Sequence, residues 1–203
     1  MRRREFIATL GSAAAWPLAA RSQQPTMPVI GYLSAASLET ARDYVAVFHR
    51  GLADEGFAEG RNVGIEYRWA EGHNDRLPAL VEDLVSRQVA VIVVGASTPG
   101  ALAAKAATKT IPIVFYVGTD PVGIGLVASL AHPDGNVTGV TALNVELFSK
   151  SLELIHSLMS PAVTIAVLIN PANAPQSAIE RNTILDVARV LDAHFDTGCG
   201  TRP

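Results

Sequence analysis

The stretch of residues 89–122 constrains the fold most, because it places two short apolar runs on either side of a helix-length segment. The first run, Val89–Val94, is mostly β-branched, and the second is Ile111–Val117. Short apolar runs bounded by Gly and Pro are typical of strands buried on both faces. The alanine-rich segment between them, Gly100–Thr108, has the length of a helix. We therefore predict a βαβ unit with two parallel strands and a right-handed crossover.

Strand-like and helix-like segments alternate on both sides of this unit, which predicts an α/β fold with a doubly wound parallel sheet. Further strands are expected at Pro28–Ser34, Asn62–Trp69, Val137–Thr141 and Val163–Ile169. Helices are expected at Thr40–Glu55, Asn74–Gln88, Pro99–Lys109, Val122–Ala131 and Pro175–His194, with one more starting near Asn144. The residues after His194 show no strand pattern. The chain is thus divided into a first lobe, residues 28–141, and the start of an incomplete second lobe, residues 142–203.

Composition narrows the class of protein. Of the 203 residues, 49% are hydrophobic and 17% are charged, so the chain can bury a core and its body is not disordered. A single cysteine, Cys199, excludes an internal disulfide framework and a cysteine-rich metal site. Residues 23–203 carry 12 basic and 18 acidic side chains. This acidic balance argues against a nucleic-acid partner.

The first 22 residues have the pattern of an export signal. Arg2–Arg4 precede an apolar stretch, Phe6–Ala20, and small residues follow at a candidate cleavage site before Gln23. The segment Arg3–Ile7 resembles a twin-arginine signal. The apolar stretch is too short and too rich in Ala and Gly for a membrane span. We expect a periplasmic mature chain that has lost this signal and has no stable membrane insertion.

Small polar residues follow the strands predicted in the first lobe. Ser97 and Thr98 follow one strand of the βαβ unit, and Thr119 and Asp120 follow the other. Ser34 ends the first strand of the chain. Because ligands bind outside the carboxyl ends of parallel strands, we expect these five residues to line one crevice.

Ser97 and Thr98 lie where a strand gives way to a helix. Free amides at a helix N-terminus, together with two hydroxyls, suit an anionic group such as a ligand carboxylate. In the alternative interpretation, Thr98 is only the N-cap of a helix whose first residue is Pro99. The two roles are compatible, since one hydroxyl can cap the helix while the other binds.

Asp120 and Asn170 each have two interpretations. Asp120 could meet a ligand ammonium group, or it could cap a turn or helix that starts at Pro121. Asn170 ends the strand predicted in the second lobe and would face the crevice from the opposite wall. The alternative for Asn170 is an ordinary Asn-Pro turn.

Other chemistries find less support. The segment Gly123–Ala128 fits a dinucleotide fingerprint, but it follows Asp-Pro instead of a strand and lacks an acidic ribose partner. Gly95–Pro99 resembles a nucleophile elbow with Pro in place of the closing Gly, which leaves an α/β hydrolase using Ser97 as an alternative. The five histidines lack paired ligand spacing. No cofactor, metal or catalytic residue is expected.

The order of several segments resembles a known family. GYLS, VIVVGASTPGALAAKAATKTIPIVF, VGTDPVGIGLVASLAHPDGNVTGVT and TIAVLINPAN follow one another as in periplasmic substrate-binding proteins of ABC transporters. The subfamily related to tryptophan- and aromatic amino-acid-binding proteins is the most similar. The resemblance covers about Met27–Leu191, and its most specific part is TDPVG…GNVTGV.

The resemblance implies a type I periplasmic-binding fold, with two α/β lobes that close on a small ligand. It also implies a non-catalytic protein that delivers its ligand, an amino acid or similar zwitterion, to a membrane permease. Family members continue further, complete the second lobe and return to the first. The last residues here, Phe195–Pro203, match nothing in that pattern. A C-terminally truncated, non-functional copy is therefore a further hypothesis.

Overall fold

The computed structural model describes residues 27–133, 135–142, 144–159, 164–171, 173–191 and 195–199. The expected export signal, residues 1–22, lies outside the described residues. Five parallel strands form one sheet in the order β2-β1-β3-β4-β5. Their bounds are β1 Val29–Ser34, β2 Gly64–Trp69, β3 Val91–Gly95, β4 Ile113–Val117 and β5 Val137–Thr141. All five strands that the sequence predicts for the first lobe are present.

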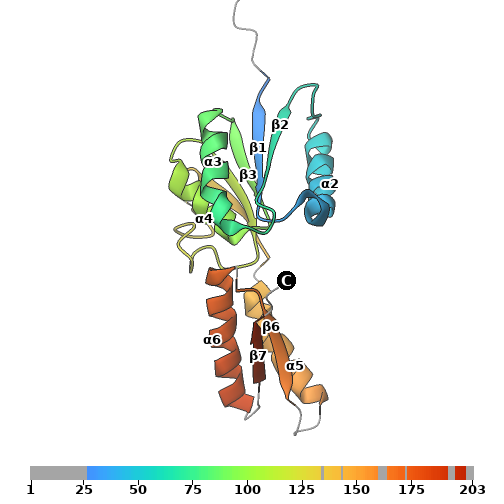
Figure 1. The fold of residues 1–203 in the computed structure, drawn as a ribbon, viewed down its shortest axis with the longest axis vertical. Helices are drawn as coiled ribbons and strands as arrows, with labels where there is room; N and C mark the ends of the chain where they lie inside the picture. The colour runs from blue at the N-terminus through green and yellow to red at the C-terminus, as the bar shows by residue number, and fades with distance from the viewer. Residues whose placement is uncertain are drawn as a thin grey trace, which may run out of the picture.

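Helices lie on both faces of this sheet, as Figure 1 shows. α2 (Leu38–Asp54) lies on one face, and α3 (Leu77–Ser86) and α4 (Thr98–Ala107) lie on the other. A short 3₁₀ turn, η2 (Asn74–Arg76), leads into α3. α2 ends in a glycine cap: Gly56 adopts a left-handed φ of 81°, and the next amide, Phe57 N, donates to Leu52 O at 2.8 Å.

The main core lies between the sheet and the helices α3 and α4. Leu33 and Ile92 from the sheet and Leu84 from α3 are fully buried there. α4 contributes Ala101 and Ala104, whose small side chains let the helix lie close to the strands. The alanine-rich crossover is therefore a packing feature of this face.

A second, smaller parallel sheet pairs β6 (Ile165–Ile169) with β7 (Phe195–Cys199), and α5 (Asn144–Leu158) and α6 (Ala174–Leu191) accompany it. The expectation of no strand after His194 was wrong, because β7 pairs in register with β6. Asp196 and Gly198 are poor strand formers, so this strand depends on pairing with its neighbour. Figure 1 shows this second unit beyond the carboxyl ends of β1 and β3.

The predicted helix Val122–Ala131 is also wrong, since this segment forms a series of turns. The amides of Leu126 and Val127 both donate to Pro121 O, at 2.8 and 3.1 Å, and Gly125 has a left-handed φ of 69°. Leu126 and Val127 are buried. The segment is apolar because Leu126 and Val127 are buried in the core. A sequence pattern cannot distinguish such a buried series of turns from a short apolar helix.

None of the helices in the described ranges is both long enough and apolar enough to cross a bilayer.

Candidate functional site

The strand order places the topological switch point of the sheet between β1 and β3. β1 has β2 on one side and β3 on the other, so the direction of winding reverses between β1 and β3. In open α/β sheets, ligands bind outside the carboxyl ends of the strands at this switch point. Ser34, the last residue of β1, is in register with Gly95, the last residue of β3. The topology therefore points to the same sheet edge as the strand-end residues.

Ser97, not Thr98, caps α4. Ser97 is extended, with φ −139° and ψ 101°, and its Oγ accepts a hydrogen bond from Gly100 N at 3.0 Å. Thr98 is already the first residue of the helix. The cap lies one residue earlier than predicted. Ala96, just before it, takes a left-handed φ of 49°, an unfavourable conformation for a residue with a Cβ. Residues held in such conformations cluster at binding and active sites.

Thr98 and Thr119 join two neighbouring strand ends. Their hydroxyl oxygens lie 3.1 Å apart, and both residues are buried. Thr141 Oγ1, at the end of β5, donates to Thr119 O at 2.8 Å. Each threonine hydroxyl has one proton, so the Thr98–Thr119 bond uses one of the two. Thr119 therefore connects the start of α4, the end of β4 and the end of β5.

Thr141 was not among the predicted site residues. It ends a strand, as Ser34 does, and the strand-end rule applied to Val137–Thr141 would have found it. Ser34 itself is buried, and its Oγ accepts from Ala36 N at 3.2 Å.

Asp120 stabilises the turn that follows it. Its two carboxylate oxygens accept from Val122 N at 2.9 Å and from Gly123 N at 3.0 Å. The structure therefore agrees with the interpretation in which Asp120 caps the segment that starts at Pro121. That segment is a turn and not a helix. A carboxylate has more acceptor sites than these two bonds use, so a further donor can still bind.

Asn170 lies at the carboxyl end of β6, on the second sheet, and its side chain is exposed. Its backbone carbonyl accepts a hydrogen bond from Ser177 Oγ, which ties this turn to the start of α6. α6 and α4 are in contact. The structure thus brings Ser34, Ser97, Thr98, Thr119 and Asp120 to one edge of the first sheet, and Asn170 comes from the other unit.

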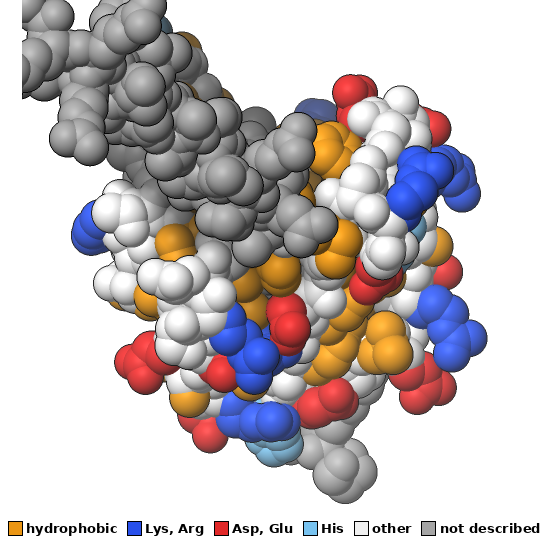
Figure 2. Space-filling model, turned by 90° about the horizontal axis from the view of Figure 1, so that it is seen from above, with side chains coloured by type: hydrophobic (Ala, Val, Ile, Leu, Met, Phe, Trp, Pro, Cys, Tyr) orange, Lys and Arg blue, Asp and Glu red, His pale blue; other side chains and the backbone are white. Residues whose placement is uncertain are grey.

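The charges at this edge come from the Asp120 carboxylate and from the backbone at the start of α4. Ser34, Ser97, Thr98 and Thr119 are uncharged, whereas the N-terminus of α4 carries a partial positive charge of roughly half a unit. Among the described residues, no group of three or more His, Cys, Asp or Glu side chains could hold a metal ion. In the coloured part of the surface in Figure 2, acidic and basic side chains are mixed, without an extended basic area.

A model of a protein family matches residues 27–189, and its description is "ABC transporter substrate binding protein". The chain belongs to this family. Its members are substrate-binding proteins, which are not enzymes. That finding, with Ser97 used as a helix cap, removes the basis for the hydrolase alternative.

Individual relatives agree with this assignment. The chain is 36% identical over 143 residues to a Tyrosine-binding protein of Clostridioides difficile. The aligned residues make up 70% of this chain and 40% of that protein. A conserved domain protein from Vibrio cholerae superposes with a TM-score of 0.74 at 30% identity. An ABC domain from Streptococcus pneumonia in complex with L-Trp gives 0.68 at 26% identity. In both superpositions, the matched residues cover 86% of this chain and 58% of the chain in the solved structure.

The fold is that of the type I periplasmic binding proteins. A Leucine binding protein from Thermotoga maritima shares it, with a TM-score of 0.61 at 12% identity, a likeness of fold alone. This chain spans 40% of the length of its curated relative and 58% of the two more similar structures.

Proposed function

We propose that this chain is the exported solute-binding component of an ABC importer and binds a small zwitterion such as an amino acid. The ligand would lie between the first sheet and the second unit, and a membrane permease would receive it. An export signal at residues 1–22 would bring the chain to the periplasm. In this assignment, residues 28–141 are the first lobe and residues 142–203 are the start of the second.

The observation that carries this proposal is the convergence of hydroxyls at the switch point of the sheet. Ser97 caps α4, and Thr98 and Thr119 are hydrogen-bonded beside it. The backbone at the N-terminus of α4, with the Ser97 and Thr98 hydroxyls, would hold a ligand carboxylate, because the hydroxyls can donate hydrogen bonds and the helix N-terminus carries a positive partial charge. Asp120 would meet the ligand ammonium, and Asn170 would contact the ligand from the opposite wall.

The relatives give independent support for the ligand class. One is named for tyrosine binding, and a related structure was determined in complex with L-Trp. Both ligands are zwitterionic amino acids. The chemistry proposed for the strand-end hydroxyls matches the part of the molecule that these two ligands share.

Isothermal titration calorimetry of the full chain with L-tyrosine, L-tryptophan and L-leucine tests the proposal. One of them should bind, and Thr98→Val should weaken binding about tenfold or more, since a hydrogen bond to a charged group contributes about 1.5–3 kcal/mol. Thr98→Ser keeps the hydroxyl and is the matched control. Equal affinity for the Val and Ser variants would remove Thr98 from the site, and no heat with any ligand would contradict the proposed ligand class.

A further inference from the structure

Thr141 is the residue at which the chain leaves the first sheet. β5 ends at Thr141, and α5 of the second unit begins at Asn144. The amide of the next residue, Ala142 N, still donates to Val117 O of β4, at 3.0 Å. Backbone pairing between β4 and β5 therefore holds the chain up to the crossover between the two units.

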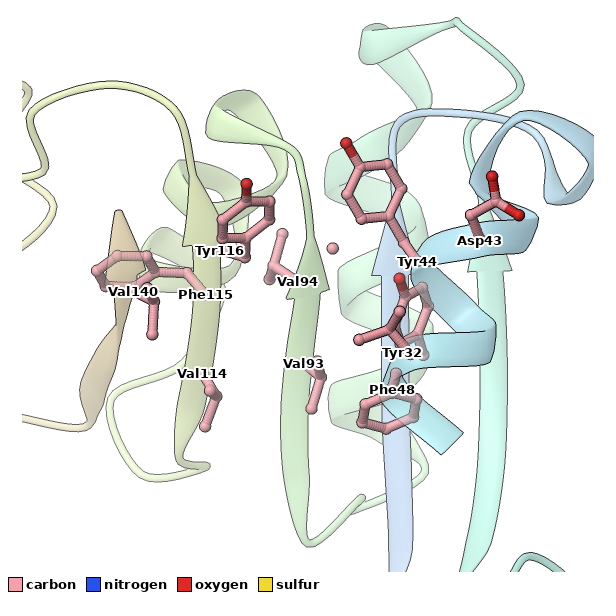
Figure 3. Close-up of a pocket in the computed structure, with 12 residues that line it drawn as sticks. Tyr32, Asp43, Tyr44, Phe48, Val93, Val94, Val114, Phe115, Tyr116 and Val140 are labelled. Atoms are coloured by element: carbon pink, nitrogen blue, oxygen red, sulfur yellow. The ribbon is translucent and has the colours of Figure 1, made fainter. Parts of the chain in front are cut away.

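The side chain of Thr141 points to the side of the sheet on which α4 lies. Val140, the residue before it, is in register with Tyr116 of β4, and Figure 3 shows both side chains on the face that carries α2. Successive side chains of a strand point to opposite faces, so Thr141 points to the α4 face. Thr98, in the first turn of α4, lies on the same side.

Thr141 contacts the loop that follows β4. Its Oγ1 donates a hydrogen bond to Thr119 O at 2.8 Å. In the strand register Thr141 pairs with Val117, so the hydroxyl reaches two residues further along the neighbouring chain. Thr119 is fully buried, and a buried carbonyl that loses its donor is costly because water does not replace it. The Thr141 side chain therefore continues the β4–β5 pairing into this loop.

The loop carries both parts of the candidate site. Thr119 Oγ1 lies 3.1 Å from Thr98 Oγ1, at the start of α4. The next residue, Asp120, holds the turn that follows it with both carboxylate oxygens. Thr119 thus bonds to Thr98 through its hydroxyl and to Thr141 through its carbonyl, and Asp120 follows it directly.

We infer that Thr141 is a positioning residue for the ligand site: its hydroxyl holds Thr119 and Asp120 against the point where the chain crosses to the second unit. The inference rests on the proposed function, which assigns the ligand carboxylate to Thr98 and the ammonium to Asp120. Ligand affinity falls with the fraction of molecules in which this loop is in place. A ligand that holds the loop in turn favours the Thr141 bond, because coupling between two sites is reciprocal. Thr141 thereby links ligand occupancy to the crossover.

Amide hydrogen exchange of the full chain without ligand, followed by NMR, tests whether Thr141 holds the loop. Thr141→Val keeps the shape of the side chain and removes its donor. The amides of Val122 and Gly123, which donate to Asp120, should then exchange about fivefold faster, the effect of losing one hydrogen bond. Thr141→Ser keeps the hydroxyl and should restore the protection. Thr138→Val makes the same substitution at an exposed residue of the same strand and should leave both rates unchanged.

Two exchange results would overturn the inference. Unchanged rates at Val122 and Gly123 in Thr141→Val would mean that the hydroxyl does not hold the loop. An equal increase at Ile92 N, which donates to Pro112 O in the core of the sheet, would mean a general loss of stability instead of a local role.

Isothermal titration calorimetry of the same variants with L-tyrosine, L-tryptophan and L-leucine tests the coupling to ligand. The amino acid that binds should bind Thr141→Val about fivefold more weakly than the unmodified chain, and Thr141→Ser and Thr138→Val within about twofold of it. Equal affinity of Thr141→Val and Thr138→Val would overturn the inference. Heat from none of the three amino acids with any variant would contradict the proposed function, whereas the exchange rates of Val122 and Gly123 decide the role of Thr141 without a ligand.

Discussion

Thr98 Oγ1 and Thr119 Oγ1 lie 3.1 Å apart, although the two residues are separated by 21 positions and follow different strands. Both are buried, so the hydrogen bond is formed away from water. It connects the first turn of α4 with the loop after β4. These are the two segments to which we assign the ligand carboxylate and ammonium.

The stability effects of substituting Thr98 and Thr119 should be strongly non-additive in a double-mutant cycle. Thr98→Val alone, or Thr119→Val alone, leaves one buried hydroxyl without this partner and should lower the free energy of unfolding by about 1–3 kcal/mol. The double variant removes both hydroxyls and should cost clearly less than the sum of the two single changes. Urea unfolding followed by circular dichroism measures all four proteins. Simple additivity would mean that the two hydroxyls do not depend on each other.

Gly95 should not tolerate a side chain. A Cβ at this position would clash with the Tyr32 hydroxyl oxygen, and the Tyr32 ring packs against the rings of Phe48 and Trp69. Gly95→Ala should therefore lower the free energy of unfolding by about 1–3 kcal/mol, because a packed region has to shift.

The matched control for Gly95→Ala is Gly51→Ala. Gly51 lies within α2 and nothing approaches its Cβ position within 4 Å. A glycine inside a helix is less favourable than alanine by about 0.5–1 kcal/mol, so this change should stabilise the protein. Thermal unfolding compares the two variants. A stability of Gly95→Ala equal to that of the unmodified chain would show that Tyr32 does not pack tightly on β3.

Tyr67 should ionise late in an alkaline titration. Burial, and next the neighbouring Glu59 carboxylate, raise the pKa of Tyr67 to about 12. Burial also raises the pKa of Tyr32. In an unfolded chain a tyrosine has a pKa of about 10. Above that value the unfolded state binds fewer protons than the folded state, so stability should fall as the pH rises through about 10 toward 12.

Ultraviolet difference spectra during the titration measure tyrosine ionisation directly. The phase near pH 12 should be smaller in Tyr67→Phe. Tyr44 is exposed, and Tyr44→Phe is the control that should keep this phase. A late phase of unchanged size in Tyr67→Phe would contradict the assignment to Tyr67.

Much of the candidate site follows from the sequence, because parallel strands bring their carboxyl ends to one edge. Ser34, Ser97 and Thr119 each follow a short apolar run, and that pattern alone places them together. Thr141 obeys the same rule at the fifth strand. Its contact with Thr119 depends on β4 and β5 being neighbours, and the structure supplies that order.

Other features depend on contacts that no local pattern contains. Ser97 caps α4 in place of the predicted Thr98, and it follows Ala96, whose left-handed conformation alanine does not signal in a sequence. β7 forms because β6 offers it a partner, despite Asp196 and Gly198. The apolar segment after Pro121 buries Leu126 in the core without forming a helix. In each case tertiary context outweighs local preference.

Thermal unfolding of the chain with a panel of amino acids tests the central claim most directly. A ligand at about one hundred times its dissociation constant stabilises the folded state by about 2.7 kcal/mol. For a chain of this size that corresponds to a rise in Tm of roughly 5–10 °C. We expect such a rise with one amino acid, and a smaller rise when Thr98→Val is tested with the same ligand. A cooperative transition that no amino acid shifts would contradict the assignment of a zwitterion-binding site to this chain.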